Sequence, residues 1–153
     1  MENGNSTLEK WNAYNQMVND RLIKHLQTLQ IKNDRIHVLM AHLVNAQLIW
    51  IERMLRRPNT MGPFEPQTLE TLIQLNDQNT AQTFSIMVHQ SLEEKISYIN
   101  TKGQKFENSI HEILIHLFNH ASYHRGQINQ LLVAEGHAPL VSDFIFYNRT
   151  PLL

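Results

Sequence analysis

Residues 113–132 read ILIHLFNHASYHRGQINQLL, and this stretch has the periodicity of a long, partly buried helix. Its histidines, His116, His120 and His124, recur every four residues, so they share one face of an α-helix. A buried imidazole needs a partner, which is either a hydrogen-bonding group or a metal ion. A single histidine on such a face is more often a hydrogen-bonded core residue. For the pair His120 and His124, followed by Arg-Gly-Gln, the pattern favours a metal.

Length and composition exclude several classes of protein. The 153 residues suit a single domain, 1–153, with a hydrophobic core large enough to be stable without cross-links. Thirteen basic residues against fourteen acidic ones give no basic surface for nucleic acid. There is no cysteine, which excludes disulfides and thiolate ligands, so any metal is held by nitrogen or oxygen. The start, MENGNSTLEKW, is not a signal peptide, and no apolar run would span a membrane, so we expect a cytoplasmic protein.

Two helices are predicted in the first third of the chain. Apolar residues at spacings of three and four indicate helix one over about residues 7–29, with Ser6 as a capping residue. Asn15 and Asn19 lie close to its apolar stripe and face either the interior or solvent. Helix two, over about 35–56, is apolar nearly all round and should be the most buried.

His42 stands in the middle of the second predicted helix, where few polar groups could satisfy it. Taken alone, such a residue is more often a hydrogen-bonded core histidine. Beside a His120 and His124 pair that lacks a third ligand, it becomes a candidate metal ligand. His37, one turn earlier, is the rival candidate, although it is easier to hydrate.

The segment 56–68, RRPNTMGPFEPQT, is a loop long enough for a crossover, so helix two need not be antiparallel to helix three. Helix three is expected from about Pro66 or Thr68 to Lys95, with a polar patch at 76–79 that could kink or split it.

A small β-hairpin is predicted over residues 97–108, around a turn at Gly103. Helix four should begin near Ser109 and stop at Gly136. A short helical turn near 142–147 should pack on the bundle end or on a second subunit. The sequence therefore predicts an all-α four-helix bundle with a hairpin before helix four and a short C-terminal helical turn.

The block HLFNHASYHRGQINQLL, with Glu135-Gly136, Pro139 and Asp143-Phe144 after it, strongly resembles the DinB family of small four-helix metalloenzymes, also called YfiT-like. Weaker matches extend over most of the chain, at Tyr14-Asn15, at His42 with Trp50 and Arg53, and at 98–103. The resemblance implies the up-down-down-up helix order and frequent homodimers. It also implies a divalent metal bound by His42, His120 and His124, with a supporting role for His116.

The chemistry of three neutral imidazoles suits zinc, nickel or ferrous iron, and it suits magnesium or calcium poorly. Three protein ligands would leave coordination positions open. A water or thiol bound there would be a stronger nucleophile, because the metal lowers its pKa. Partners for the ligand rings are expected among residues within helical reach: Asn45, Asn119, Tyr123 and Gln127. Arg125 should pair with a buried carboxylate rather than bind an anionic substrate.

Two classes of function remain open. Some relatives in the resembled family transfer low-molecular-weight thiols to electrophiles, which would make this protein a metal-dependent transferase with a thiol cofactor. A hydrolase that uses metal-bound water on a small-molecule substrate is a variant. The alternative is a metal-stabilised stress-response or binding module without turnover. A metal site open to solvent and lined by polar groups from helices one and three would favour the enzyme.

Overall fold

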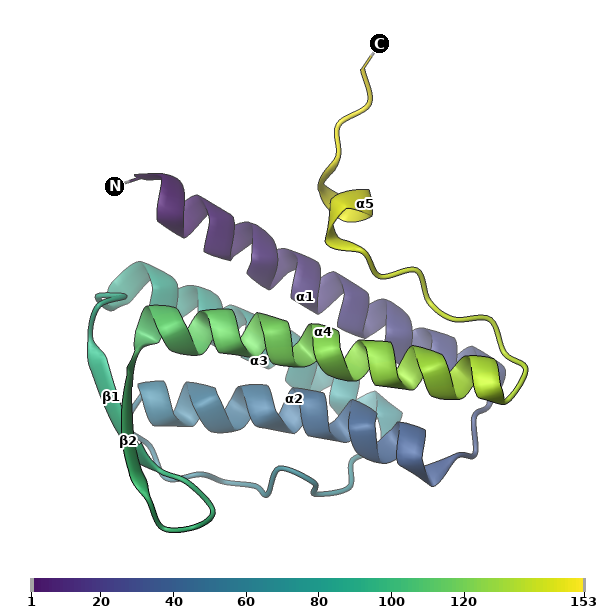
Figure 1. Ribbon diagram of the computed structural model, residues 1–153, viewed down its shortest axis with the longest axis horizontal. Coiled ribbons are helices and arrows are strands. Elements are labelled where there is room, and N and C mark those ends of the chain that lie inside the picture. Colours follow the sequence, from purple (N-terminus) through teal and green to yellow (C-terminus); the bar gives the residue numbers. More distant parts are fainter. Residues whose placement is uncertain (1, 153) are drawn as a thin grey trace.

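Long helices dominate the computed structural model, which describes residues 2–152 (Figure 1). In chain order the elements are α1 (Glu2–Leu29), α2 (Asp34–Met54), α3 (Leu69–His89), β1 (Lys95–Ile99), β2 (Lys105–Ser109), α4 (Ile110–Ala134) and α5 (Phe144–Asn148). Within this part of the chain, no helix is both long and apolar enough to cross a membrane.

The four long helices form an up-down-down-up bundle, as predicted. Figure 1 shows α2 and α3 running in the same direction, with the loop 55–68 carrying the chain back along the bundle between them. α1 packs mainly against α3, and α2 packs mainly against α4. The α2–α4 contact brings together the two helices that carry the candidate ligands.

Apolar and polar residues alternate in layers along the bundle axis. One apolar cluster contains Leu26, Val44 and Ile128, and a second contains Leu8, Met54 and Leu114. On each long helix, buried polar residues fall between the positions that feed the two clusters: Asn12, Asn15, Asn19, Asn45, Gln47, Asn76, Asn79, Thr83 and Arg125. The core is therefore two apolar ends joined by a hydrogen-bonded polar layer.

The boundaries of two helices differ from the prediction. α1 begins at Glu2 rather than near residue 7, so Ser6 lies inside the helix and does not cap it. α3 ends at His89 instead of continuing to Lys95, which begins β1. The physical reason is a backbone contact, because the Leu92 carbonyl accepts a hydrogen bond from the His111 amide at 2.9 Å. This long-range contact outweighs the local helical periodicity.

The polar patch of α3 neither kinks nor splits the helix. Asn76 and Asn79 are fully buried, and each side-chain amide donates a 3.0 Å hydrogen bond to a neighbouring helix. The acceptors are the Gln16 carbonyl on α1 and the Val44 carbonyl on α2. These asparagines therefore join α3 to its neighbours.

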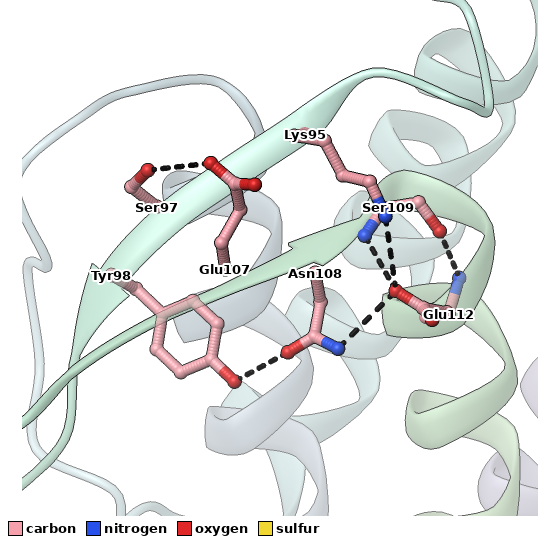
Figure 2. Close-up of polar contacts among 7 residues, drawn as sticks. All are labelled: Lys95, Ser97, Tyr98, Glu107, Asn108, Ser109 and Glu112. Atoms are coloured by element: carbon pink, nitrogen blue, oxygen red, sulfur yellow. Dashed lines mark hydrogen bonds and ion pairs between the residues drawn. The ribbon is translucent and has the colours of Figure 1, made fainter.

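The start of α4 is fixed by a capping box (Figure 2). The Glu112 amide donates to Ser109 Oγ at 3.1 Å, and the Ser109 amide donates to Glu112 Oε2 at 2.8 Å. The Ser109 amide, then Asn108 and Lys95, lower the pKa of the exposed Glu112 carboxyl. Tyr98 on β1 donates to Asn108 Oδ1 at 2.7 Å, so the hairpin and the cap form one network.

Replacing Ser109 with alanine should destabilise the protein by about 1 kcal/mol, because the Glu112 amide loses its capping acceptor. Denaturant unfolding of the two proteins gives the difference. Ser91→Ala, at an exposed serine in the turn before β1, is the matched control and should leave the midpoint unchanged. Equal midpoints for both variants would show that the box does not stabilise α4.

The C-terminal segment folds back on α1 of its own chain. Phe144 stacks on Trp11 with 4.3 Å between ring centroids, and Tyr14 donates a hydrogen bond to the Ser142 carbonyl. Asp143 is the N-cap of α5, although its side chain makes no capping bond. The sequence left open whether this segment packs on its own bundle or on a second subunit. The structure shows Phe144 packed on its own bundle.

Candidate metal centre

Three imidazole nitrogens converge where α2 crosses α4. His120 Nε2 lies 3.2 Å from His42 Nε2 and 3.1 Å from His124 Nε2. Ligand nitrogens about 2.05 Å from a tetrahedral zinc ion lie about 3.3 Å apart, so these separations match a shared ion. The group of His42, His120 and His124 could hold a divalent metal.

Hydrogen bonds at the far side of two rings fix which nitrogen carries the proton. His42 Nδ1 lies 2.9 Å from the Pro63 carbonyl, and His124 Nδ1 lies 2.7 Å from Gln127 Oε1. A carbonyl oxygen can only accept, so in each neutral ring Nδ1 carries the hydrogen and Nε2 keeps its lone pair. The lone pairs of His42 Nε2 and His124 Nε2 therefore point at the same small volume. His120 Nε2 carries at most one proton, so it can donate a hydrogen bond to only one of them.

The electrostatics of the cluster keep its central ring neutral. Burial lowers the pKa of His120 to about 3, with further lowering from the neighbouring His124, His42 and His116. Burial also lowers the pKa of His124, against the opposing effect of its hydrogen bond to Gln127. Imidazole coordinates metal only when neutral, so these two groups are ready to act as ligands at neutral pH.

The free energy of unfolding of the metal-free protein should fall as the pH drops below about 6.5. Below this value His120 of the unfolded chain takes up a proton. Folded His120 takes up no proton until pH about 3, so its contribution is lost across the window between these values. The loss is at most about 1 kcal/mol per pH unit, after allowance for partial solvent screening. Thermal melts in chelator at pH 7.5, 6 and 5 measure it. The slope should be shallower in His120→Ala, and equal slopes would contradict this assignment.

The loop before α3 contributes to the site in a way that the sequence did not reveal. Phe64 stacks on the His42 ring with 4.3 Å between centroids and an angle of 8° between the planes. Asn45 Nδ2 donates to the Glu65 carbonyl at 2.8 Å, which holds this loop against α2. Asn45 therefore acts on the loop rather than on a ligand ring. No local pattern in the loop predicts these contacts, because the partners of Phe64 and Glu65 lie within α2, at His42 and Asn45.

The other predicted partners divide between the site and the opposite face of α4. Gln127 bonds the His124 ring, as predicted, and its Nε2 donates to the Tyr123 hydroxyl at 3.1 Å. Asn119 instead lines a separate hollow beside Trp11, between α4 and α1. Of the four candidates, Gln127 alone bonds a ligand ring directly within the described chain.

His116 lies next to the cluster without joining it. Its ring centroid is 5.5 Å from that of His120 and 5.5 Å from that of Trp50. Burial lowers its pKa. Together with Trp50 and Tyr98 it lines a hollow of about 220 Å³ beside the cluster.

His37, the rival candidate to His42, bonds a backbone carbonyl, and so do two further histidines outside the cluster. His37 lies 2.7 Å from the Ile31 carbonyl, and His25 lies 2.8 Å from that of Ala138. His89, at the exposed end of α3, lies 2.9 Å from the Ser85 carbonyl. These rings bond backbone carbonyls outside the cluster, and the geometry leaves His42 as the partner of the α4 pair.

Arg125 points into the polar layer rather than into the histidine cluster. It is 1% exposed, and its Nη1 donates to Asn15 Oδ1 at 2.7 Å and to Asn19 Oδ1 at 2.8 Å. Nη2 donates to Ser122 Oγ at 3.0 Å. The expected carboxylate partner was wrong, since amide and hydroxyl oxygens take its place among the described residues. Asn15 and Asn19 are accordingly buried.

Two comparisons with known proteins bear on the family to which this chain belongs. A search of curated proteins gave no match to this sequence. A family-level comparison matches residues 1–151 to the DinB family. The match covers nearly all of the 153 residues, and the chain therefore belongs to the DinB family.

Proposed function

We propose that His42, His120 and His124 bind a divalent metal ion and that this centre activates a thiol or water for attack on a small-molecule substrate. The convergence of three Nε2 atoms at 3.1–3.2 Å carries the proposal. The donor set holds neither carboxylate nor thiolate, which favours zinc or nickel, with ferrous iron as a third candidate. A bound ion would lower the pKa of the attached water or thiol and so supply the nucleophile.

The residues around the cluster support this role. Pro63 and Gln127 hold two ligand rings in the orientation that coordination needs, so little reorganisation accompanies binding. Three protein ligands leave a position for a fourth, exchangeable ligand, which is the pattern of catalytic zinc sites. The hollow beside His116 and Trp50 lies on the α2, hairpin and α4 side of the cluster, and none of the three candidate ligands lines it. Helices one and three do not line it, contrary to the lining that would have favoured an enzyme from sequence.

The test has two stages on the purified full chain. Zinc, nickel and ferrous iron are first titrated into chelator-treated protein, with one ion per chain expected. The loaded protein is then assayed for transfer of cysteine or glutathione to an aromatic chloride, and for ester hydrolysis. Metal-dependent turnover that is absent in His120→Ala supports the enzyme. Tight binding without turnover of either substrate type would favour the alternative, a metal-stabilised binding module.

We also propose that the protein is a homodimer. Exposed apolar side chains gather in the C-terminal segment, where Ile145 is 59% and Leu152 is 98% exposed. Apolar patches of this kind often mark interfaces, and two-fold symmetry is the commonest arrangement. Light scattering at micromolar concentration should give twice the chain mass. A monomer mass that persists on concentration would overturn the proposal.

A further inference from the structure

Four basic side chains surround one hollow at the end of α2 away from the histidine cluster. The hollow has a volume of about 510 Å³. Arg53, Arg56 and Arg57 come from the end of α2 and the first residues after it, and Lys95 comes from β1. None of the described residues that line the hollow is acidic.

Neighbouring carboxylates balance only part of this positive charge. Glu94 pairs with Arg56 at 2.5 Å, and Glu112 lies 3.8 Å from Lys95. Among residues 6–152, whose side chains the structure describes, Arg53 and Arg57 form no ion pair. Two guanidinium groups with ten N–H donors between them are therefore available to an anion at this site.

Aromatic stacking holds Arg53 in place. Its guanidinium carbon lies 4.5 Å from the Trp50 ring centre and 5.1 Å from that of Tyr98. Burial lowers its pKa from the ordinary value for arginine, yet arginine remains charged in proteins. A stacked guanidinium keeps its in-plane N–H donors free for bidentate contact with a carboxylate or phosphate.

The backbone of the turn gives a second, independent observation. The Arg57 amide donates to the Glu52 carbonyl at 2.8 Å, which closes the end of α2. This closure puts Arg56 at a φ of 54°, in the left-handed region that favours glycine. A side chain other than glycine is strained in this conformation, and strained residues are often found at functional sites. The turn places Arg56 and Arg57 around the hollow that Arg53 of α2 also lines.

A shared aromatic wall connects this hollow to the histidine cluster. Tyr98 lines both the basic hollow and the smaller one that contains Trp50 and His116. Arg53 follows His42 by eleven residues, which is three helical turns on the same face, or about 16 Å along the helix axis. A ligand that reached both ends would be an elongated small molecule.

We propose that Arg53 and Arg57 bind the carboxylate or phosphate group of a small anionic molecule, whose other end extends along the Trp50–Tyr98 wall toward the histidine cluster. The substrate or thiol of the proposed reaction is then an elongated anion. This link rests on the proposed function, whereas the anion contacts themselves need no metal. The concave shape and the net charge of −1 favour a small ligand over a polyanion.

Trp50 provides the readout, because its ring touches Arg53. The sequence holds two tryptophans, so Trp11→Phe leaves Trp50 as the sole source of indole fluorescence. Inorganic phosphate and succinate serve as probes, and each should change the emission saturably. Arg53→Gln and Arg57→Gln should each weaken binding about tenfold, by loss of one charge-assisted contact. Arg149→Gln removes a guanidinium stacked on Phe146 in the tail and should change nothing.

Each outcome bears on the proposal. Tighter binding of phosphate assigns a phosphate-bearing ligand, and tighter binding of succinate assigns a carboxylate. Non-saturable responses, or equal affinity in the wild type and both α2 variants, overturn the proposal. Calorimetric titration of the unaltered protein repeats the measurement without the Trp11 change. Anion binding that persists in His120→Ala separates this site from the metal centre, so failure of the metal proposal is recognised independently.

Discussion

The His120→Ala protein is expected to lose stoichiometric binding of divalent metal. His120 Nε2 lies 3.2 Å from His42 Nε2 and 3.1 Å from His124 Nε2, so its removal leaves only two of the three donors. Loss of one of three imidazoles should reduce affinity by a factor on the order of 1,000, from the size of metal-binding free energies in proteins. Elemental analysis of purified protein, followed by calorimetric titration, measures the effect.

Three further variants make this test specific. His89→Ala removes a histidine whose ring bonds a carbonyl at the exposed end of α3, and it should retain one ion per chain. Gln127→Ala leaves all three ligands but frees the His124 ring, so an intermediate loss of about 10- to 100-fold is expected. Full metal content in His124→Ala would exclude the assignment of the ligands.

Replacing Arg125 with alanine should destabilise the fold by about 3 kcal/mol or more. The change leaves the buried oxygens of Asn15 and Asn19 without their donor and opens a cavity in the polar layer. Denaturant unfolding at pH 7.5 measures the loss. Arg149→Ala, at an exposed arginine, is the control and should change stability by less than about 0.5 kcal/mol.

Arg125→Met distinguishes the hydrogen bonds from the space that the side chain fills. Methionine fills much of the same volume but donates nothing, so it should still destabilise by about 1–3 kcal/mol. Burying a charge is itself costly, and replacement of buried charges by apolar groups sometimes stabilises proteins. A methionine variant as stable as the wild type would therefore show that the hydrogen bonds of Arg125 only offset the cost of burying its charge.

Local patterns predicted the elements and the α4 half of the histidine cluster. A spacing of four residues fixes His120 and His124 on one helix face whatever surrounds the helix. Likewise, Ser109 and Gly136 are recognisable as a cap and a stop, and the structure confirms both. His42 required a further step, since its place opposite the pair depends on how two helices pack.

Contacts between distant segments could not be predicted in this way. Arg125 lies 110 residues from Asn15 and 106 from Asn19, and nothing local to either asparagine indicates an arginine partner. The end of α3 is set by a backbone pairing with the start of α4, which competes with a sequence that still favours helix. The bond from His42 to Pro63 depends on the path of the crossover loop over α2.

That crossover loop has a consequence for protein engineering. Surface connections usually tolerate insertions and deletions, and they are the first segments to be shortened when a scaffold is rebuilt. Here the Pro63 carbonyl and the Phe64 ring orient His42, so a change in loop length would reach the site although no ligand is altered. Transplanting the three histidines onto another bundle without this loop would leave one imidazole free to choose the wrong tautomer.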